Sequence, residues 1–87
     1  MAVFMVERSL KGITMAQLAA AQKQAIACSD AFDAGGRKVR YIRTTFVPGE
    51  ERSMCLFEAQ SAGDVEQVNV TAQLPYVRII EALDLTP

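Results

Sequence analysis

Two stretches of the chain share one design, in which an apolar run ends in a glutamate and a helix-start signal follows. The first stretch is "VFMVERSLKGIT", whose apolar run ends at Glu7, and the second is "MCLFEAQSAGD", whose run ends at Glu58. Short apolar runs rich in β-branched and aromatic residues are typical of buried strands. The repeat therefore predicts two similar strand–helix halves within one small fold.

Each of these strands leads into a capping pattern. Thr14 followed by Gln17 matches a capping box, and Ser61 followed by Asp64 offers the second helix start. The first helix should carry one apolar stripe, with small or apolar residues three and four positions apart. These residues are Leu18, Ala21, Ala25, Cys28 and Phe32. The small members of the stripe would let the helix lie close to a sheet.

The remaining segments complete a βαββαβ order. Strands are expected at residues 2–8, 38–47, 52–59 and 76–85. The helices should end at Gly35-Gly36 and at Leu74-Pro75. This order predicts a single ferredoxin-like domain over residues 1–87, of the α+β class. Its antiparallel four-stranded sheet should have the order 4-1-3-2, with both helices on one face.

The size and composition of the chain favour a homodimer. A domain of 87 residues buries only about 60–65% of the surface that its unfolded chain exposes. The composition is nevertheless 51% hydrophobic, with a formal charge of −1. Such a chain has more apolar surface than one small core uses, so a second copy is the expected partner.

Several classes of partner and site are not expected. Nucleic acid needs clustered Lys and Arg, and the densest basic stretch, residues 37–43, alternates like a strand. No apolar run approaches 18 residues and no leader is evident, so we expect a cytoplasmic protein without a membrane partner. Cys28 and Cys55 are expected to be buried free thiols, although a disulfide or a metal pair remains an alternative. The chain contains no histidine, and we expect neither a cofactor nor a metal.

Strand parity predicts which side chains share a face. Counting back from the turn at residues 48–51, Val47 should oppose Arg52, Tyr41 should oppose Glu58, and Arg43 should oppose Leu56. One face would hold Val3, Met5, Glu7, Tyr41, Arg43, Met54, Leu56, Glu58, Val77, Ile79 and Glu81. The face under the helices would hold Phe4, Val6, Ile42, Phe46, Cys55, Phe57, Ala59 and Ile80. The last strand could also take the opposite assignment.

The first of these faces is largely apolar and carries charges, and no further element of the chain is left to cover it. Two such sheets packed about 10 Å apart would form a dimeric α+β barrel.

Buried charges must be paired or face a polar cavity. The candidate ligand-binding residues are Glu7, Tyr41, Arg43, Glu58 and Glu81. The alternative is that these charges form structural ion pairs only. Glu7 and Glu58 end antiparallel strands, so they should lie toward opposite ends of the sheet.

Four segments together resemble a known family. They are "FMVERS", "QLAAAQ", "CLFEA" and "LPYVRIIEALDL". They are similar to the small proteins grouped as domain of unknown function 4242, some of which are named nickel-binding proteins. The resemblance implies a ferredoxin-like fold, a dimer and no assigned reaction, with Val6-Glu7-Arg8 and Glu58-Ala59 at signature positions. Nickel prefers nitrogen and sulfur donors, and because histidine is missing here we do not extend nickel binding to this chain. A hard cation held by Glu7, Glu58 and Glu81 across a dimer remains an alternative.

Three functions are compatible with these features. The leading hypothesis is a homodimer that binds a small molecule or ion in a cavity between the two sheets. The second is a cofactor-free isomerase or monooxygenase, by analogy of fold alone, with Glu58 beside Tyr41 as a proton shuttle. The third is a purely structural dimer.

Overall fold

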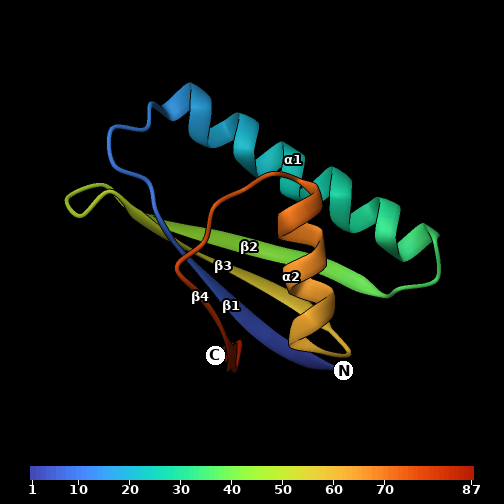
Figure 1. The fold of residues 1–87 in the computed structure, drawn as a ribbon. Coiled ribbons are helices and arrows are strands. Elements are labelled where there is room, and N and C mark those ends of the chain that lie inside the picture. Colours follow the sequence, from blue (N-terminus) through green and yellow to red (C-terminus); the bar gives the residue numbers. More distant parts are fainter.

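A computed structural model describes all 87 residues and confirms the βαββαβ order (Figure 1). The elements are β1 (Ala2–Ser9), α1 (Met15–Ala34), β2 (Val39–Val47), β3 (Arg52–Ala59), α2 (Ala62–Thr71) and β4 (Arg78–Ala82). The four strands form one antiparallel sheet in the order β2-β3-β1-β4, which is the predicted order read from the other edge. Both helices lie on the same side of this sheet (Figure 1).

Both helices begin with the predicted caps. The backbone N–H of Gln17 donates to Thr14 Oγ1 at 3.1 Å, and the Thr14 N–H donates to Gln17 Oε1 at 3.0 Å. At the start of α2, the Asp64 N–H donates to Ser61 Oγ at 3.2 Å. These side chains satisfy backbone donors that have no partner inside the helix.

The core lies between the helices and the sheet. Its buried apolar members are Phe4, Val6, Ala25, Val39, Cys55, Phe57, Ala59, Val65 and Val68. The predicted stripe of α1 faces this core, where Ala25 is buried and Cys28 and Phe32 pack against the cluster. Each large apolar side chain buried here contributes about 1.5–3 kcal/mol.

The register of the central strands separates the two glutamates, as predicted. Along β1, Val3 pairs with Glu58 and Glu7 pairs with Met54. The two acids are therefore four residues apart along the strand direction, or about 13 Å. The predicted pairs Val47 with Arg52 and Arg43 with Leu56 are also present.

The prediction for Tyr41 is wrong because β2 contains a bulge. Tyr41 pairs with Phe57 and Arg43 with Leu56, so Ile42 is an extra residue in the strand. A bulge shifts the alternation by one residue, and Tyr41 therefore points under the helices. Its ring meets that of Phe57 edge to face, with centroids 5.6 Å apart. Glu58 is opposite Arg40 instead.

The last strand takes the alternative face assignment, one residue out of step with the assignment that we favoured from the sequence. Ile79 pairs with Val6 and packs against the core, whereas Glu81 pairs with Phe4 and lies on the helix side. The register starts where the Val77 N–H donates to the Glu7 carbonyl at 2.7 Å. β4 is also shorter than predicted. Its last pair is Val3 with Ala82, and because β1 begins at Ala2, the residues after Ala82 have almost no partner strand left.

Tyr76, in the loop before β4, ties that loop to α2. Its hydroxyl donates to Glu66 Oε2 at 2.9 Å. This hydrogen bond raises the pKa of Tyr76 above its ordinary 10.0, and desolvation and the negative charge of Glu66 add to the effect. The stability that the bond contributes is complete below pH 10 and is lost as the pH rises through the raised pKa.

We expect a Glu66→Gln variant to lower the pKa of Tyr76, since the amide removes the charge and weakens the acceptor. Phenolate absorbance followed against pH measures the shift, and Tyr76→Phe identifies which of the two tyrosines gives the signal. An unchanged midpoint in Glu66→Gln would show that the hydrogen bond does not control this titration.

Candidate functional site on the open face of the sheet

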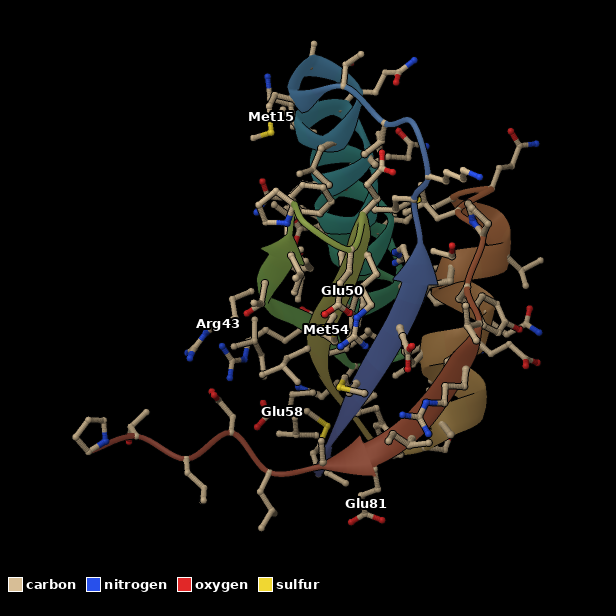
Figure 2. All side chains as sticks on the ribbon, turned by 90° about the vertical axis from the view of Figure 1, so that its left-hand side faces the viewer. Met15, Arg43, Glu50, Met54, Glu58 and Glu81 are labelled. Atoms are coloured by element: carbon tan, nitrogen blue, oxygen red, sulfur yellow. The ribbon has the colours of Figure 1, made fainter.

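The sheet surface opposite the helices, here called the open face, has an apolar centre. Its apolar residues are Val3, Met5, Met54, Leu56 and Ile80. Met5, Met54 and Leu56 remain half-exposed, because both helices lie on the other side of the sheet (Figure 1). Figure 2 looks onto Met54 and Glu58, which project from this face of β3. An uncovered apolar centre on a small domain is typical of a binding surface.

At one end of the open face, Glu7 is held by two arginines. Its Oε1 accepts from Arg78 Nε at 2.8 Å, and its Oε2 lies 3.6 Å from Arg52 Nη1. Arg52 Nε also reaches Glu50 in the hairpin turn, at 2.6 Å. The Glu7 side chain keeps 18% of its surface exposed. Glu7 is therefore a charge-paired group at the rim of the apolar centre.

At the other end, Glu58 pairs with Arg40, at 3.3 Å between Oε1 and Nε. Arg43 lies at its predicted position opposite Leu56, and its Nη1 pairs with Asp84 Oδ1 at 3.0 Å. The bulge at Ile42 brings Arg40 to the open face as well, directly opposite Glu58. Glu58 is thus neutralised by a residue that the sequence analysis did not select.

The Arg43–Asp84 pair positions the chain that follows β4. β4 and β2 form opposite edges of the sheet, so the tail crosses below the open face to reach Arg43 (Figure 2). Leu83 and Leu85, on either side of Asp84, remain strongly exposed. The tail therefore adds apolar side chains beside the apolar centre.

Of the five residues predicted to form the site, the structure brings three to the open face. Glu7, Arg43 and Glu58 lie there, whereas Tyr41 and Glu81 are on the helix side. The residues that sequence reasoning missed are Arg40, Arg52, Arg78 and Asp84. A correct register for the last strand would have identified Arg78, which is directly opposite Glu7.

Tyr41 belongs to a separate set of hydrogen bonds under α1. Its hydroxyl accepts from Gln22 Nε2 at 2.9 Å and is also bonded to Thr44. The enzyme alternative required Tyr41 beside Glu58 as part of a proton shuttle. Since the two side chains project from opposite faces of the sheet, that arrangement is not present.

The charged groups of the open face are paired with one another. Four arginines accompany three carboxylates, and each of Glu7, Glu58 and Asp84 contacts a guanidinium. No three of the Cys, Asp and Glu side chains of the chain come together. The two thiols, Cys28 and Cys55, belong to the helix side of the sheet. This face therefore holds no thiol or imidazole, and its only sulfur atoms are the thioethers of Met5 and Met54.

The chain is similar to known proteins in both its sequence and its fold. The sequence model of a family described as "Nickel responsive protein SCO4226-like" matches residues 4–82. The crystal structure of SCO4226 from Streptomyces coelicolor A3(2) superimposes with a TM-score of 0.80 at 27% sequence identity, and the match covers 98% of this chain and 100% of that chain. No curated protein matches the chain. Neither helix of the structure has the length and apolar character that crossing a membrane requires.

Proposed function

We propose that this chain, which belongs to the nickel-responsive SCO4226-like family, is a homodimeric small-ligand-binding protein. In the proposed dimer, the open faces of two copies pack against each other and enclose the ligand between the sheets. The observation that carries the proposal is the apolar centre around Met5, Met54 and Leu56, which is half-buried and which neither helix covers. Burying it would supply the hydrophobic free energy that a small domain lacks.

A second copy suits the open face because the face is self-complementary in charge. Its arginines and carboxylates occur in similar numbers at both ends of the apolar centre. A two-fold axis through the centre would bring the same patch of each copy together, with arginines of one copy near acids of the other. An apolar centre within a charged rim is also the usual anatomy of a protein interface.

The ligand that we propose is a small organic molecule rather than nickel. Glu7, Glu58 and Arg43 would line the mouth of the cavity, and the methionines and Leu56 would line its interior. Because every carboxylate there is already paired with an arginine, a cation would have to displace a guanidinium to bind. Both cysteines are free, which suits a reducing, cytoplasmic location.

We expect sedimentation velocity to show a dimer at micromolar concentration. A Leu56→Glu variant should weaken association at least about 100-fold, because it buries an unpaired charge in the interface. Val70→Glu makes the same kind of change at an exposed site on α2 and should leave the dimer intact. A monomeric wild type would overturn the proposal, and a Leu56→Glu variant that still dimerises would place the interface elsewhere.

Native mass spectrometry of freshly isolated protein tests the ligand. The expected result is a dimer that retains the mass of a small organic molecule, which Leu56→Glu loses. A dimer of bare protein mass would contradict tight binding between the sheets while leaving the dimer itself in place.

A further inference from the structure

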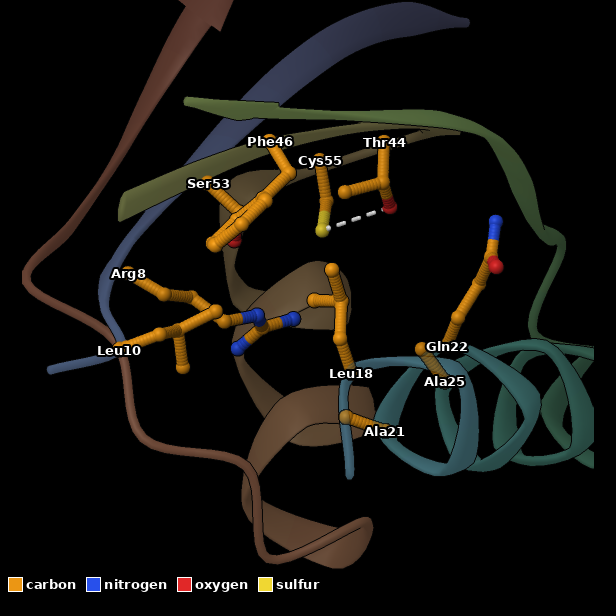
Figure 3. Close-up of a pocket in the computed structure, with 10 residues that line it drawn as sticks. All are labelled: Arg8, Leu10, Leu18, Ala21, Gln22, Ala25, Thr44, Phe46, Ser53 and Cys55. Carbon is orange, nitrogen blue, oxygen red and sulfur yellow. Dashed lines mark hydrogen bonds between the residues drawn. The ribbon is translucent and has the colours of Figure 1, made fainter. Parts of the chain in front are cut away.

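A cavity of about 120 Å³ lies on the helix side of the sheet, between the sheet and the first half of α1 (Figure 3). Leu18, Ala21 and Ala25 of α1 form its roof, and the sheet beneath contributes Arg8, Ser53 and Phe46. These last three residues are cross-strand neighbours, since Arg8 pairs with Ser53 and Ser53 pairs with Phe46. The alanines of the roof leave the space that larger side chains would fill.

Arg8 contributes a buried positive charge to the wall of this cavity, and that charge has no negative partner. The residue is 3% exposed, and no carboxylate lies within 4.0 Å of it. Its Nη1 donates to the Pro75 carbonyl at 2.9 Å, and its Nη2 donates to Asn69 Oδ1. Both acceptors are neutral, and two of the five N–H groups of a guanidinium are engaged in this way. Burying a charge without a counter-charge is unfavourable, and an anion in the cavity would offset that cost.

Ser53 supplies a second unused donor next to Arg8. The residue is 1% exposed, yet its hydroxyl has no partner within the chain. All polar side-chain atoms that are completely shielded from solvent have a hydrogen-bond partner. Because the Ser53 hydroxyl has no partner, it is not completely shielded, and it opens onto the cavity that Ser53 lines. Its position opposite Arg8 places the two donors on one part of the cavity wall.

The polar groups elsewhere in the cavity are already paired with one another. Gln22 Nε2 donates to Tyr41, whose hydroxyl is bonded to Thr44. Thr44 Oγ1 in turn lies 3.1 Å from Cys55 Sγ (Figure 3). The unused hydrogen-bonding capacity is therefore concentrated at the end of the cavity formed by Arg8 and Ser53.

We propose that this cavity binds a small organic acid. The carboxylate would be held by the Arg8 guanidinium and the Ser53 hydroxyl, and the apolar body would lie against Leu18, Ala21 and Phe46. Charge-assisted hydrogen bonds from a guanidinium suit a carboxylate well. An apolar cavity of about 150 Å³ holds a benzene molecule, so this somewhat smaller, open-sided cavity suits short-chain or single-ring acids. The site is on the opposite side of the sheet from the open face, and it does not depend on the proposed dimer.

Titration calorimetry with benzoate, butyrate, benzamide and inorganic phosphate tests the ligand class. We expect benzoate to bind saturably, and benzamide, which has the same shape without the charge, to bind at least about tenfold more weakly. Phosphate should also bind more weakly, because it makes no use of the apolar walls. Failure of both benzoate and butyrate to saturate, or equal binding of benzamide or phosphate, would overturn the proposal.

Substitutions at the cavity locate the binding. Ala21→Leu should weaken benzoate binding at least about tenfold by filling the space, whereas Ala20→Leu, on the exposed side of α1, should not change it. Asn69→Asp puts a carboxylate beside Arg8 without occupying the cavity, and should also weaken benzoate at least about tenfold. Circular dichroism confirms that each variant is folded. Equal affinity in Ala21→Leu and Ala20→Leu, or unchanged affinity in a folded Asn69→Asp, would contradict the assignment.

Discussion

Replacing Phe57 by alanine is expected to lower the free energy of unfolding by about 3–5 kcal/mol. Phe57 is 0% exposed in the centre of β3, and its ring packs edge to face with that of Tyr41. The substitution removes this contact and leaves a cavity that the surrounding residues fill only in part. Domains of this size have a total stability of about 4–13 kcal/mol, so the variant should lose a large share of that stability.

Urea denaturation followed by circular dichroism measures the loss, and Phe46→Ala is the matched control. Phe46 is the same residue type on the same side of the sheet, but it is only half-buried at the edge of the α1 cavity. Its removal should cost clearly less, about 1–2 kcal/mol. Equal losses at the two positions would mean that the core is not centred on Phe57.

Replacing Asn69 by leucine is expected to cost about 2–4 kcal/mol. Asn69 is 0% exposed on α2 and is the only side chain that accepts a hydrogen bond from Arg8. Without it, a buried guanidinium loses a partner, and the Val65 carbonyl loses the donor that now lies 2.8 Å away. Removing one partner of a buried charge is more costly than removing both.

A double-mutant cycle with Arg8→Met separates these effects. The double variant should be more stable than the sum of the two single losses predicts, by about 1–3 kcal/mol, because no charge then remains buried without a partner. Chemical denaturation of the four proteins gives the coupling free energy. A coupling near zero would show that Arg8 does not depend on Asn69, and would weaken the argument that its charge lacks compensation.

The sequence was sufficient for the parts of the fold that depend on local signals. The capping residues Thr14 and Ser61 marked both helix starts, and the turn at residues 48–51 set the hairpin register as far back as Arg43. The strand order followed from the handedness of the crossovers. The separation of Glu7 and Glu58 then followed from the antiparallel direction of the central strands.

The remaining parts of the candidate sites depend on contacts between distant segments. No local pattern distinguishes Ile42 as an extra residue in β2. The pairing of Arg43 with Asp84 joins β2, at one edge of the sheet, to the segment that follows β4, the strand at the other edge. Strand alternation does place Arg8 on the helix side, two residues after Val6. A charged residue at a strand end is ordinarily solvated, however. Predicting the burial of Arg8 would have required knowing where α2 and the loop before β4 lie.

The bulge makes one position of β2 dispensable to the facing of its side chains. It allows Arg40 and Arg43, three positions apart, to reach solvent from one surface, whereas an unbroken strand of the same sequence would point them in opposite directions. Deleting Ile42 would join Tyr41 directly to Arg43 and leave a regular strand, with Arg40 still opposite Glu58 and Tyr41 still opposite Phe57. The loss of one residue here should therefore be better tolerated than a deletion within β3, which would turn part of that strand to the opposite face.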